Sequence, residues 1–327
     1  MNKHGVNTAV GSQHGEQEKG PSLTSTDQRA IGAHRPRRSS HMLRREAWWA
    51  YLFIAPFCLL FLIFSIGPYI YSFVLSFDRY AGFGTAIPVG LHNYISILQY
   101  HVFWTEVWNT IFYWLAHAIP LIPIAFLLAF LVRSKLIKGQ RFWKPVIFLP
   151  QVMTIVAVSL VFQTLFSTQY GVVNQVFHTH IQWMENYSIT RWVVVLMLIW
   201  QGLGFWFVVF LAGLTSIDPS LEEASIIDGA SVWQRLRYVI IPLMRNIFLF
   251  AFAIDAIGSM RLYTQPNVLV SRASLADPQI APLLNLLVSN LQGGSFGQSA
   301  AVGWLLFIIT ILITAMLFGV FRVTGGE

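Results

Sequence analysis

Long uninterrupted runs of apolar residues dominate the pattern of this chain. A helix needs about 20 residues to cross a hydrocarbon layer of about 30 Å, and several runs reach that length. They cover residues 48–75, 107–132, 145–167, 192–214, 247–270 and 301–321. Because they are continuous and do not alternate every second residue, they predict helices and not barrel strands. The pattern predicts an all-α integral membrane protein with six transmembrane helices.

The segment before the first run has a different pattern. Residues 1–46 are rich in Gly, Ser, Thr, Gln and His and show no apolar periodicity. Such a composition buries too little apolar surface to order itself. We therefore expect a disordered basic tail over 1–46, with RPRR at 35–38 near anionic lipid head groups, and a six-helix membrane domain over 47–327. The first run is too long for the core of a signal peptide.

Composition supports the membrane assignment, and the placement of charge predicts the orientation. The chain is 55% hydrophobic and 11% charged, whereas a soluble domain has roughly 25% charged residues.

The net charge of +7 would suggest nucleic acid in a soluble protein. However, the basic residues gather in two loops, 133–144 and 235–245, while Arg79, Arg191 and Arg272 stand alone in the others. By the positive-inside rule both basic loops and both termini are cytoplasmic, and no nucleic-acid role is expected.

The sequence shows no catalytic constellation. It has no G-x-x-x-x-G-K-[ST] phosphate loop, no H-E-x-x-H and no C-x-x-C, and these are the motifs that would carry such chemistry. His178 and His180 lack further ligands, so we expect solvated histidines and no metal site. Cys58 lies in the first run and is expected to be a buried, unreactive thiol. If ATP drives this protein, another chain binds it.

The connection between the fourth and fifth runs is unusually rich in charge. Asp218 and Pro219 are typical of an N-cap and first helical residue, and Gly229 is typical of a helix end. Ser231 and Gln234 match the capping box of a second helix. The pattern predicts a helix, a glycine turn and a second amphipathic helix, which has Trp233, Leu236 and Ile240 on its apolar side and ends at Pro242.

Two interpretations fit this hairpin. It could rest on lipid head groups and only connect two spans. Alternatively, small residues at 224, 225 and 230 could let a partner's groove come close, while Glu223 offers a charge for an ion pair. The local pattern alone favours neither.

The spacing in this loop resembles the cytoplasmic EAA loop of the membrane subunits of binding-protein-dependent ABC importers. That pattern is E-A-A, three residues, G, nine residues, I-x-L-P, and its extension is DGA. It falls on Glu223, Ala224, Ser225, Asp228, Gly229, Ala230, Val239, Ile241 and Pro242, with three conservative replacements. The resemblance covers about 48–322 and is closest to the first-subunit type of sugar importers, through FIAPFCLLFLIFSIGPYIYSFVLSF, GLHNYISIL, WNTIFY and FGQSAAVGWLLF. YTQPNVL departs from the TxGGP that often follows span five.

The resemblance implies a type I importer fold in a bacterial-type plasma (inner) membrane. It implies four kinds of partner: a second six-span permease subunit, two ATP-binding cassette ATPase subunits, an extracytoplasmic solute-binding protein and membrane lipid. ATP would be used by the ATPase partner, and this chain would bind no cofactor. The EAA helix would couple closure of the ATPase dimer to the solute pathway. The solute would be a sugar or a glycerol-phosphate-like molecule.

Two other classes remain open at this point. A stand-alone, ion-coupled secondary transporter or channel would need intramembrane ionisable groups in matched repeats, and no such repeat is recognisable across the six runs. An intramembrane enzyme is the third class. The 12 Trp residues suit sugar stacking, but tryptophan also gathers at membrane interfaces.

Span five carries the candidate solute pathway. Asp255 is the only acid well inside the six runs, and a carboxylate at that depth should face water or a partner. On a continuous helix Gly258, Ser259, Leu262 and Pro266 share its side, while Arg261 lies about 120° away, beside Gln265. The candidate pathway residues are Asp255, Ser259, Arg261, Tyr263 and Gln265. The alternative is that Asp255 bonds a neighbouring helix while Arg261 reaches outward.

Reporter fusions test the predicted topology. Fusions at Gln140 and Ser231 should read cytoplasmic, because both lie close to clusters of basic residues. Fusions near Thr179 and Ala281 should read external. A cytoplasmic signal at Thr179 would contradict the six-span arrangement.

Overall fold

The structure, a computed structural model, describes residues 40–134, 139–270 and 277–323. The chain divides into two units, 1–65 and 66–327, and each is described by itself. Three parts of the sequence predictions lie outside the described residues. They are the tail as far as residue 39, the loop lysines Lys135 and Lys138, and Arg272.

The first unit contains the long helix α1, Ser40–Phe61, which continues into the π-helix η2, Leu62–Ile66. The prediction of disorder is therefore wrong for residues 40–46. The stretch Leu43 to Ala47 consists of good helix formers, and extending an existing helix costs less than nucleating one. Residues 51–64 are all exposed, so the expectation of a buried Cys58 is also wrong. This segment is apolar on every side, as a lipid-facing helix is.

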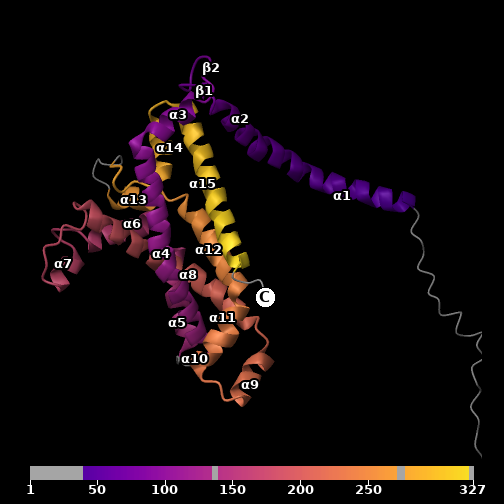
Figure 1. Cartoon of the computed structure of the whole chain (residues 1–327), viewed down its shortest axis with the longest axis vertical. Helices are drawn as coiled ribbons and strands as arrows, with labels where there is room; N and C mark the ends of the chain where they lie inside the picture. Colours follow the sequence, from indigo (N-terminus) through magenta and orange to yellow (C-terminus); the bar gives the residue numbers. More distant parts are fainter. Residues whose placement is uncertain (1–39, 135–138, 271–276, 324–327) are drawn as a thin grey trace, which may run out of the picture. The chain divides into compact units, whose positions relative to one another are not determined.

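The described residues of the second unit form helices and one short hairpin, which are joined by loops. Its helices are α2 Gly67–Leu75, α3 His92–Gln99, α4 His101–Arg133, α5 Gln140–Val152, α6 Ile155–Leu165, α7 Val172–Val176, α8 Tyr187–Thr215, α9 Pro219–Ile227, α10 Val232–Arg235, the π-helix η3 Leu236–Ile240, α11 Ile241–Leu243, α12 Arg245–Ser259, α13 Thr264–Leu269, α14 Leu283–Gln292 and α15 Phe296–Val323. The strands β1, Asp78–Arg79, and β2, Ile87–Pro88, pair antiparallel with Asp78 opposite Pro88. Within this unit the hairpin and α9 lie at opposite ends (Figure 1).

Among the described residues, four helical segments are long and apolar enough to cross a membrane. They are Tyr51–Leu75, His101–Arg133, Tyr187–Thr215 and Phe296–Phe321. Two bent pairs bring the number to six if each counts as one span. They are α5 with α6, bent by 97°, and Val232–Leu243 with Arg245–Ser259, bent by 65°. The run 145–167 is therefore not the single straight helix that the pattern predicted. The run 247–270 is divided as well, because α12 ends at Ser259 and α13 begins at Thr264.

Both of the wrongly predicted runs are broken for local reasons. At the end of α5, Met153 and Thr154 take up extended backbone, and the Thr154 hydroxyl then caps α6 by accepting a bond from the Ala157 N–H at 3.3 Å. Threonine is a favoured N-cap. Between α12 and α13 the chain leaves the helix at Met260, which places Pro266 in the first turn of α13. In a continuous helix its ring would clash with the carbonyl four residues earlier.

The core of the second unit lies between α4, α8 and α12, which run beside one another in Figure 1. Phe126 of α4, Phe210 of α8 and Phe248 of α12 meet with ring centroids 4.9–5.6 Å apart. Helix α5 packs closely on α8 at Gly204, where an added Cβ would lie 2.9 Å from the carbonyl oxygen of Ile147. Glycine at this position is what allows the two backbones to approach.

Polar side chains on α4 hold the segment that leads into α14. Two of them accept from backbone N–H groups of α14: the carboxylate of Glu106 from Leu286 at 3.0 Å, and the Thr110 hydroxyl from Leu283 at 2.8 Å. Two others donate to carbonyls of the segment before α14. The Asn109 amide donates to Pro278 and Ala281 at 2.7 and 2.9 Å, and the Tyr113 hydroxyl donates to Ile280 at 2.9 Å. Because no side chain of its own caps α14, α4 supplies the cap. Glu106 is 2% exposed, although it lies just outside the predicted run 107–132. Helix α4 begins earlier than the predicted run and so includes Glu106.

Candidate functional site

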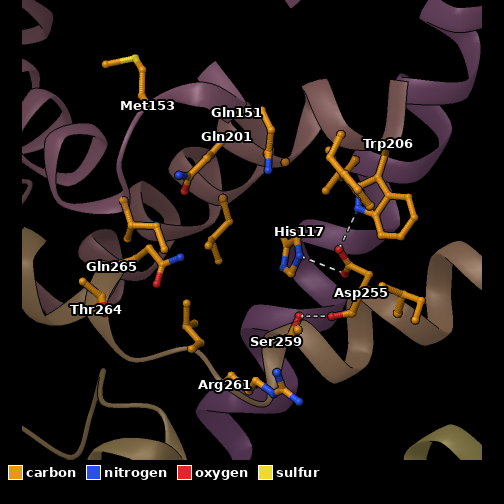
Figure 2. Close-up of a pocket in the computed structure, with 18 of the residues that line it drawn as sticks. His117, Gln151, Met153, Gln201, Trp206, Asp255, Ser259, Arg261, Thr264 and Gln265 are labelled. Atoms are coloured by element: carbon orange, nitrogen blue, oxygen red, sulfur yellow. Dashed lines mark hydrogen bonds and ion pairs between the residues drawn. The ribbon is translucent and has the colours of Figure 1, made fainter. Parts of the chain in front are cut away.

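A cavity of about 750 Å³ lies where the breaks after α5 and α12 approach α4 and α8 (Figure 2). Its lining residues are His117, Leu121, Gln151, Met153, Thr154, Ile155, Leu198, Gln201, Gly202, Phe205, Trp206, Ile254, Asp255, Gly258, Ser259, Arg261, Leu262, Thr264 and Gln265. Non-helical backbone at membrane depth is tolerated only where it is buried in protein or lines a water-filled cavity. Both breaks contribute residues to the wall of this cavity.

Asp255 on α12 is held from two neighbouring helices. Its Oδ1 accepts a hydrogen bond from Nε1 of Trp206 on α8 at 3.1 Å, and its Oδ2 lies 3.0 Å from Nε2 of His117 on α4 (Figure 2). The side chains of His117 and Asp255 are 8% and 9% exposed. The first part of the predicted alternative, in which Asp255 bonds a neighbouring helix, is therefore confirmed, whereas Arg261 lines the cavity. Asp255 also lines the cavity, so the same carboxylate both bonds neighbouring helices and borders the cavity.

The bonding of His117 determines how a proton is placed at Asp255. Nδ1 of His117 lies 2.6 Å from the carbonyl oxygen of Tyr113, and a carbonyl can only accept, so Nδ1 carries a hydrogen. Nε2 then faces the carboxylate with or without a second proton. At 3.0 Å two lone pairs would repel, so one proton lies between Nε2 and Oδ2. The pair is electrically neutral whichever atom holds that proton.

Most of the predicted pathway residues come together at the cavity. Asp255, Ser259, Arg261 and Gln265 line it, and Tyr263 does not. Ser259 is buried and its hydroxyl donates to the Asp255 carbonyl at 2.7 Å. Helix geometry had placed Arg261 and Gln265 off the side of Asp255. They reach the cavity because α12 ends at Ser259 and the chain turns.

Sequence reasoning missed the residues that other helices contribute. His117 and Trp206 hold Asp255, while Gln151 and Gln201 add side-chain amides to the wall. The available signal was a polar residue within an otherwise apolar run. A histidine in one span and a carboxylate in another form a natural pair, but spacing along the chain does not reveal it.

The cavity offers groups that bind hydroxyls and contains no nucleophile with an adjacent base. In the described part of the chain, the side-chain amides of Gln151, Gln201 and Gln265 make no hydrogen bond, and Figure 2 shows all three around the space that His117 and Asp255 also border. Each amide can donate and accept at once. The rings of Phe205 and Trp206 add apolar surface. The arrangement suits binding a polar molecule.

The loop predicted to form a hairpin has the expected caps. The Asp218 carboxylate accepts from the Ser220 N–H at 2.9 Å at the start of α9, and this bond lowers the pKa of Asp218. Gly229 has φ of 76°, and Ser231 and Gln234 form a reciprocal capping box. These features confirm the predicted helix starts and the glycine turn.

The second helix of this loop differs from the prediction. Pro242 does not end it but lies in α11, after the π-helix η3, and the chain bends at Met244. The missing N–H of Pro242 is accommodated by the π-helix, whose bonds have a longer spacing. Leu236 and Ile240 are buried as expected, whereas Trp233 is 65% exposed.

Helix α9 presents an apolar surface with an acidic residue beside it. Leu221, Ile226 and Ile227 are 46%, 56% and 85% exposed. Glu222 forms an ion pair with Arg133, which ties α9 to the end of α4. Of the predicted docking residues, Glu223, Ala224, Asp228, Gly229 and Pro242 are exposed, Ala230 is half-buried and Ser225 is buried.

His178 and His180, which the sequence predicts to be solvated histidines, are both exposed. Among the described residues, no group of three or more His, Cys, Asp or Glu side chains is arranged to hold a metal ion.

Comparison with known proteins finds relatives over most of the chain. Residues 94–324 match the family described as binding-protein-dependent transport system inner membrane component. The arabinooligosaccharides transport system permease protein AraP of Bacillus subtilis (strain 168) is 31% identical, over 84% of this chain and 90% of AraP. The lactose transport system permease protein LacF of Rhizobium radiobacter is 27% identical, over 82% of this chain and 92% of LacF. A solved bacterial alginate ABC transporter, in complex with alginate pentasaccharide-bound periplasmic protein, matches with a TM-score of 0.73 at 20% identity, covering 84% of this chain and 93% of that chain.

Two buried tryptophans test the anchoring of Asp255. The indole N–H of Trp206 donates to Asp255, whereas that of Trp114, in the same core, has no partner among the described residues. Trp206→Phe should therefore cost about 1.5 kcal/mol more than Trp114→Phe in the free energy of unfolding, or about 3 °C in Tm. Thermal unfolding in detergent measures the difference. Equal losses for the two variants would mean that the bond to Asp255 contributes nothing.

Proposed function

Because the chain belongs to the family of binding-protein-dependent transport system inner membrane components, we propose that it is a permease subunit of an ATP-driven sugar importer. The family match over residues 94–324 carries this proposal. The names of AraP and LacF, an arabinooligosaccharide and a lactose permease protein, support a sugar as the solute. The cavity, with its unbonded amides and aromatic rings, is the proposed part of the solute pathway in this subunit.

The proposed topology has six spans and places both termini in the cytoplasm. Each bent pair counts as one span, which adds two to the four straight ones. The distribution of lysine and arginine supports the orientation. The wholly exposed apolar residues 51–64 suit contact with lipid or with another membrane subunit.

The proposed importer contains four kinds of chain besides lipid. This subunit pairs with a second six-span permease, two ATPase subunits dock from the cytoplasm, and an extracytoplasmic protein delivers solute. ATP is bound and hydrolysed by the ATPase subunits, and this chain binds no cofactor. The solved alginate transporter, which is bound to a periplasmic protein, supports the delivery step.

We place the coupling between ATPase and pathway at α9. Its exposed apolar residues and Glu223 would insert into the ATPase subunit, while the bond from Glu222 to Arg133 would transmit the movement to α4. On α4, Arg133 lies about 24 Å from His117 at 1.5 Å per residue. His117 contacts Asp255 at the cavity wall. A continuous chain of contacts thus leads from the docking helix to the pathway.

A stand-alone ion-coupled transporter is the second candidate function. One observation favours it: the His117–Asp255 pair is ionisable and buried within the predicted spans. Uptake into proteoliposomes separates the two candidates. An ATP-driven importer takes up sugar only with the ATPase subunits and ATP, whereas an ion-coupled transporter needs only an ion gradient.

Two adjacent glutamates on α9 test the coupling role. Glu223→Lys should leave the protein inserted but abolish uptake and reduce the ATPase recovered with this subunit. Reversing a charge at a partly buried contact costs on the order of 2–5 kcal/mol. Glu222→Gln is a control for docking alone, because Glu222 faces Arg133 within the chain: it should retain most of the ATPase even if uptake falls. Normal uptake by Glu223→Lys would refute docking through this residue.

A further inference from the structure

The charges at the cavity do not balance. Its lining includes three ionisable side chains, those of His117, Asp255 and Arg261. The first two share one proton and form a neutral pair, and Asp255 also accepts the bond from Trp206. Among the described residues, no ion pair joins Asp255 to Arg261.

Arg261 carries the remaining charge. Its guanidinium does not lose its proton in proteins, its side chain is exposed, and it pairs with no acid among the described residues. Arg261 lies in the turn between α12 and α13, on the wall of the cavity beside Ser259 (Figure 2). An arginine at membrane depth faces water or an anionic partner, because exposure to lipid is costly.

The groups around Arg261 are of the kind that bind sugars. The amides of Gln151, Gln201 and Gln265 are unengaged, and the volume of about 750 Å³ lies within the range of small-molecule sites. A neutral sugar would satisfy the amides but would leave the guanidinium without a counter-charge. An acidic group on the sugar would give it one, in the bidentate geometry that guanidinium favours.

We propose that the solute of this pathway is an anionic saccharide, whose carboxylate or phosphate group pairs with Arg261 while its hydroxyls bond the three glutamines. This inference rests on the proposed function and specifies its substrate class. It makes Arg261 a specificity residue that discriminates by charge.

Matched pairs of sugars test the proposal on the purified importer complex, in nanodiscs and without its solute-binding protein. One pair is digalacturonate and its dimethyl ester, and the other is trehalose 6-phosphate and trehalose. The first pair tests a carboxylate and the second a phosphate. Affinity is measured by saturation-transfer NMR titration for the wild type, Arg261→Gln and Arg79→Gln. Arg79 is exposed in β1 and outside the cavity, so the last variant removes the same charge elsewhere.

The wild type should bind the acidic member of at least one pair about tenfold or more tightly than the neutral member. A hydrogen bond to a charged group contributes at least a decade in affinity. Arg261→Gln should remove this preference by weakening the acidic sugar alone. Arg79→Gln should leave it intact. The pair of sugars in which the wild type prefers the acidic member shows whether the acidic group of the solute is a carboxylate or a phosphate.

Several results would overturn the inference. They are binding of neither pair by the wild type, equal binding of both members of each pair, and a preference that persists in Arg261→Gln. If Arg261→Gln instead released the second permease subunit and left sugar binding unchanged, Arg261 would pair with an acid of that subunit. ATP-dependent uptake of a neutral oligosaccharide that is insensitive to Arg261→Gln would preserve the proposed function and reject this inference. Failure of ATP-dependent uptake for every saccharide would reject the proposed function itself.

Discussion

The contact of Asp255 with His117 and Trp206 is the constraint on which the arrangement of this unit depends. A buried carboxylate is tolerated only when it is paired and hydrogen-bonded, and leaving one partner unmatched costs about 3–5 kcal/mol. Because the two partners come from α4 and α8, three helices must keep their register at this depth. The aromatic core and the cavity wall both follow from that register.

Helix α4 extends this constraint in both directions. Towards α9, its last residue Arg133 pairs with Glu222, and towards α14 its polar side chains cap the helix start through Glu106 and Thr110. The 33 residues of α4 thus carry the contacts to the docking helix, the cavity and α14. A movement of α9 would reach the cavity through this helix, as well as through α8, to which α9 is joined directly along the chain. This connection is the physical basis of the proposed coupling.

Features that depend on neighbouring residues were predictable from the sequence, and contacts between distant helices were not. The runs 107–132 and 192–214 lie within the observed α4 and α8, and the caps at Asp218 and Ser231 are local hydrogen bonds that sequence spacing reveals. Apolarity continues through the breaks near Thr154 and Met260, so composition did not mark them, although Pro266 was a signal. The partners of Asp255 lie on other helices. Helical periodicity relates residues of one helix only, so it gives no sign of these contacts between helices.

The side of α12 next to Asp255 borders the proposed water-filled pathway. Gly258 lines the cavity and has open space where a side chain would begin, whereas Ala256 is 1% exposed in the core. Cysteine is introduced at each position with Cys58→Ala as background, and its rate of reaction with a small water-soluble thiol reagent is measured. Gly258→Cys should react, and its rate should change when sugar binds or the ATP-bound state is trapped, while Ala256→Cys stays unreactive. An unreactive Gly258→Cys in every state, together with a reactive Ala256→Cys, would contradict the account.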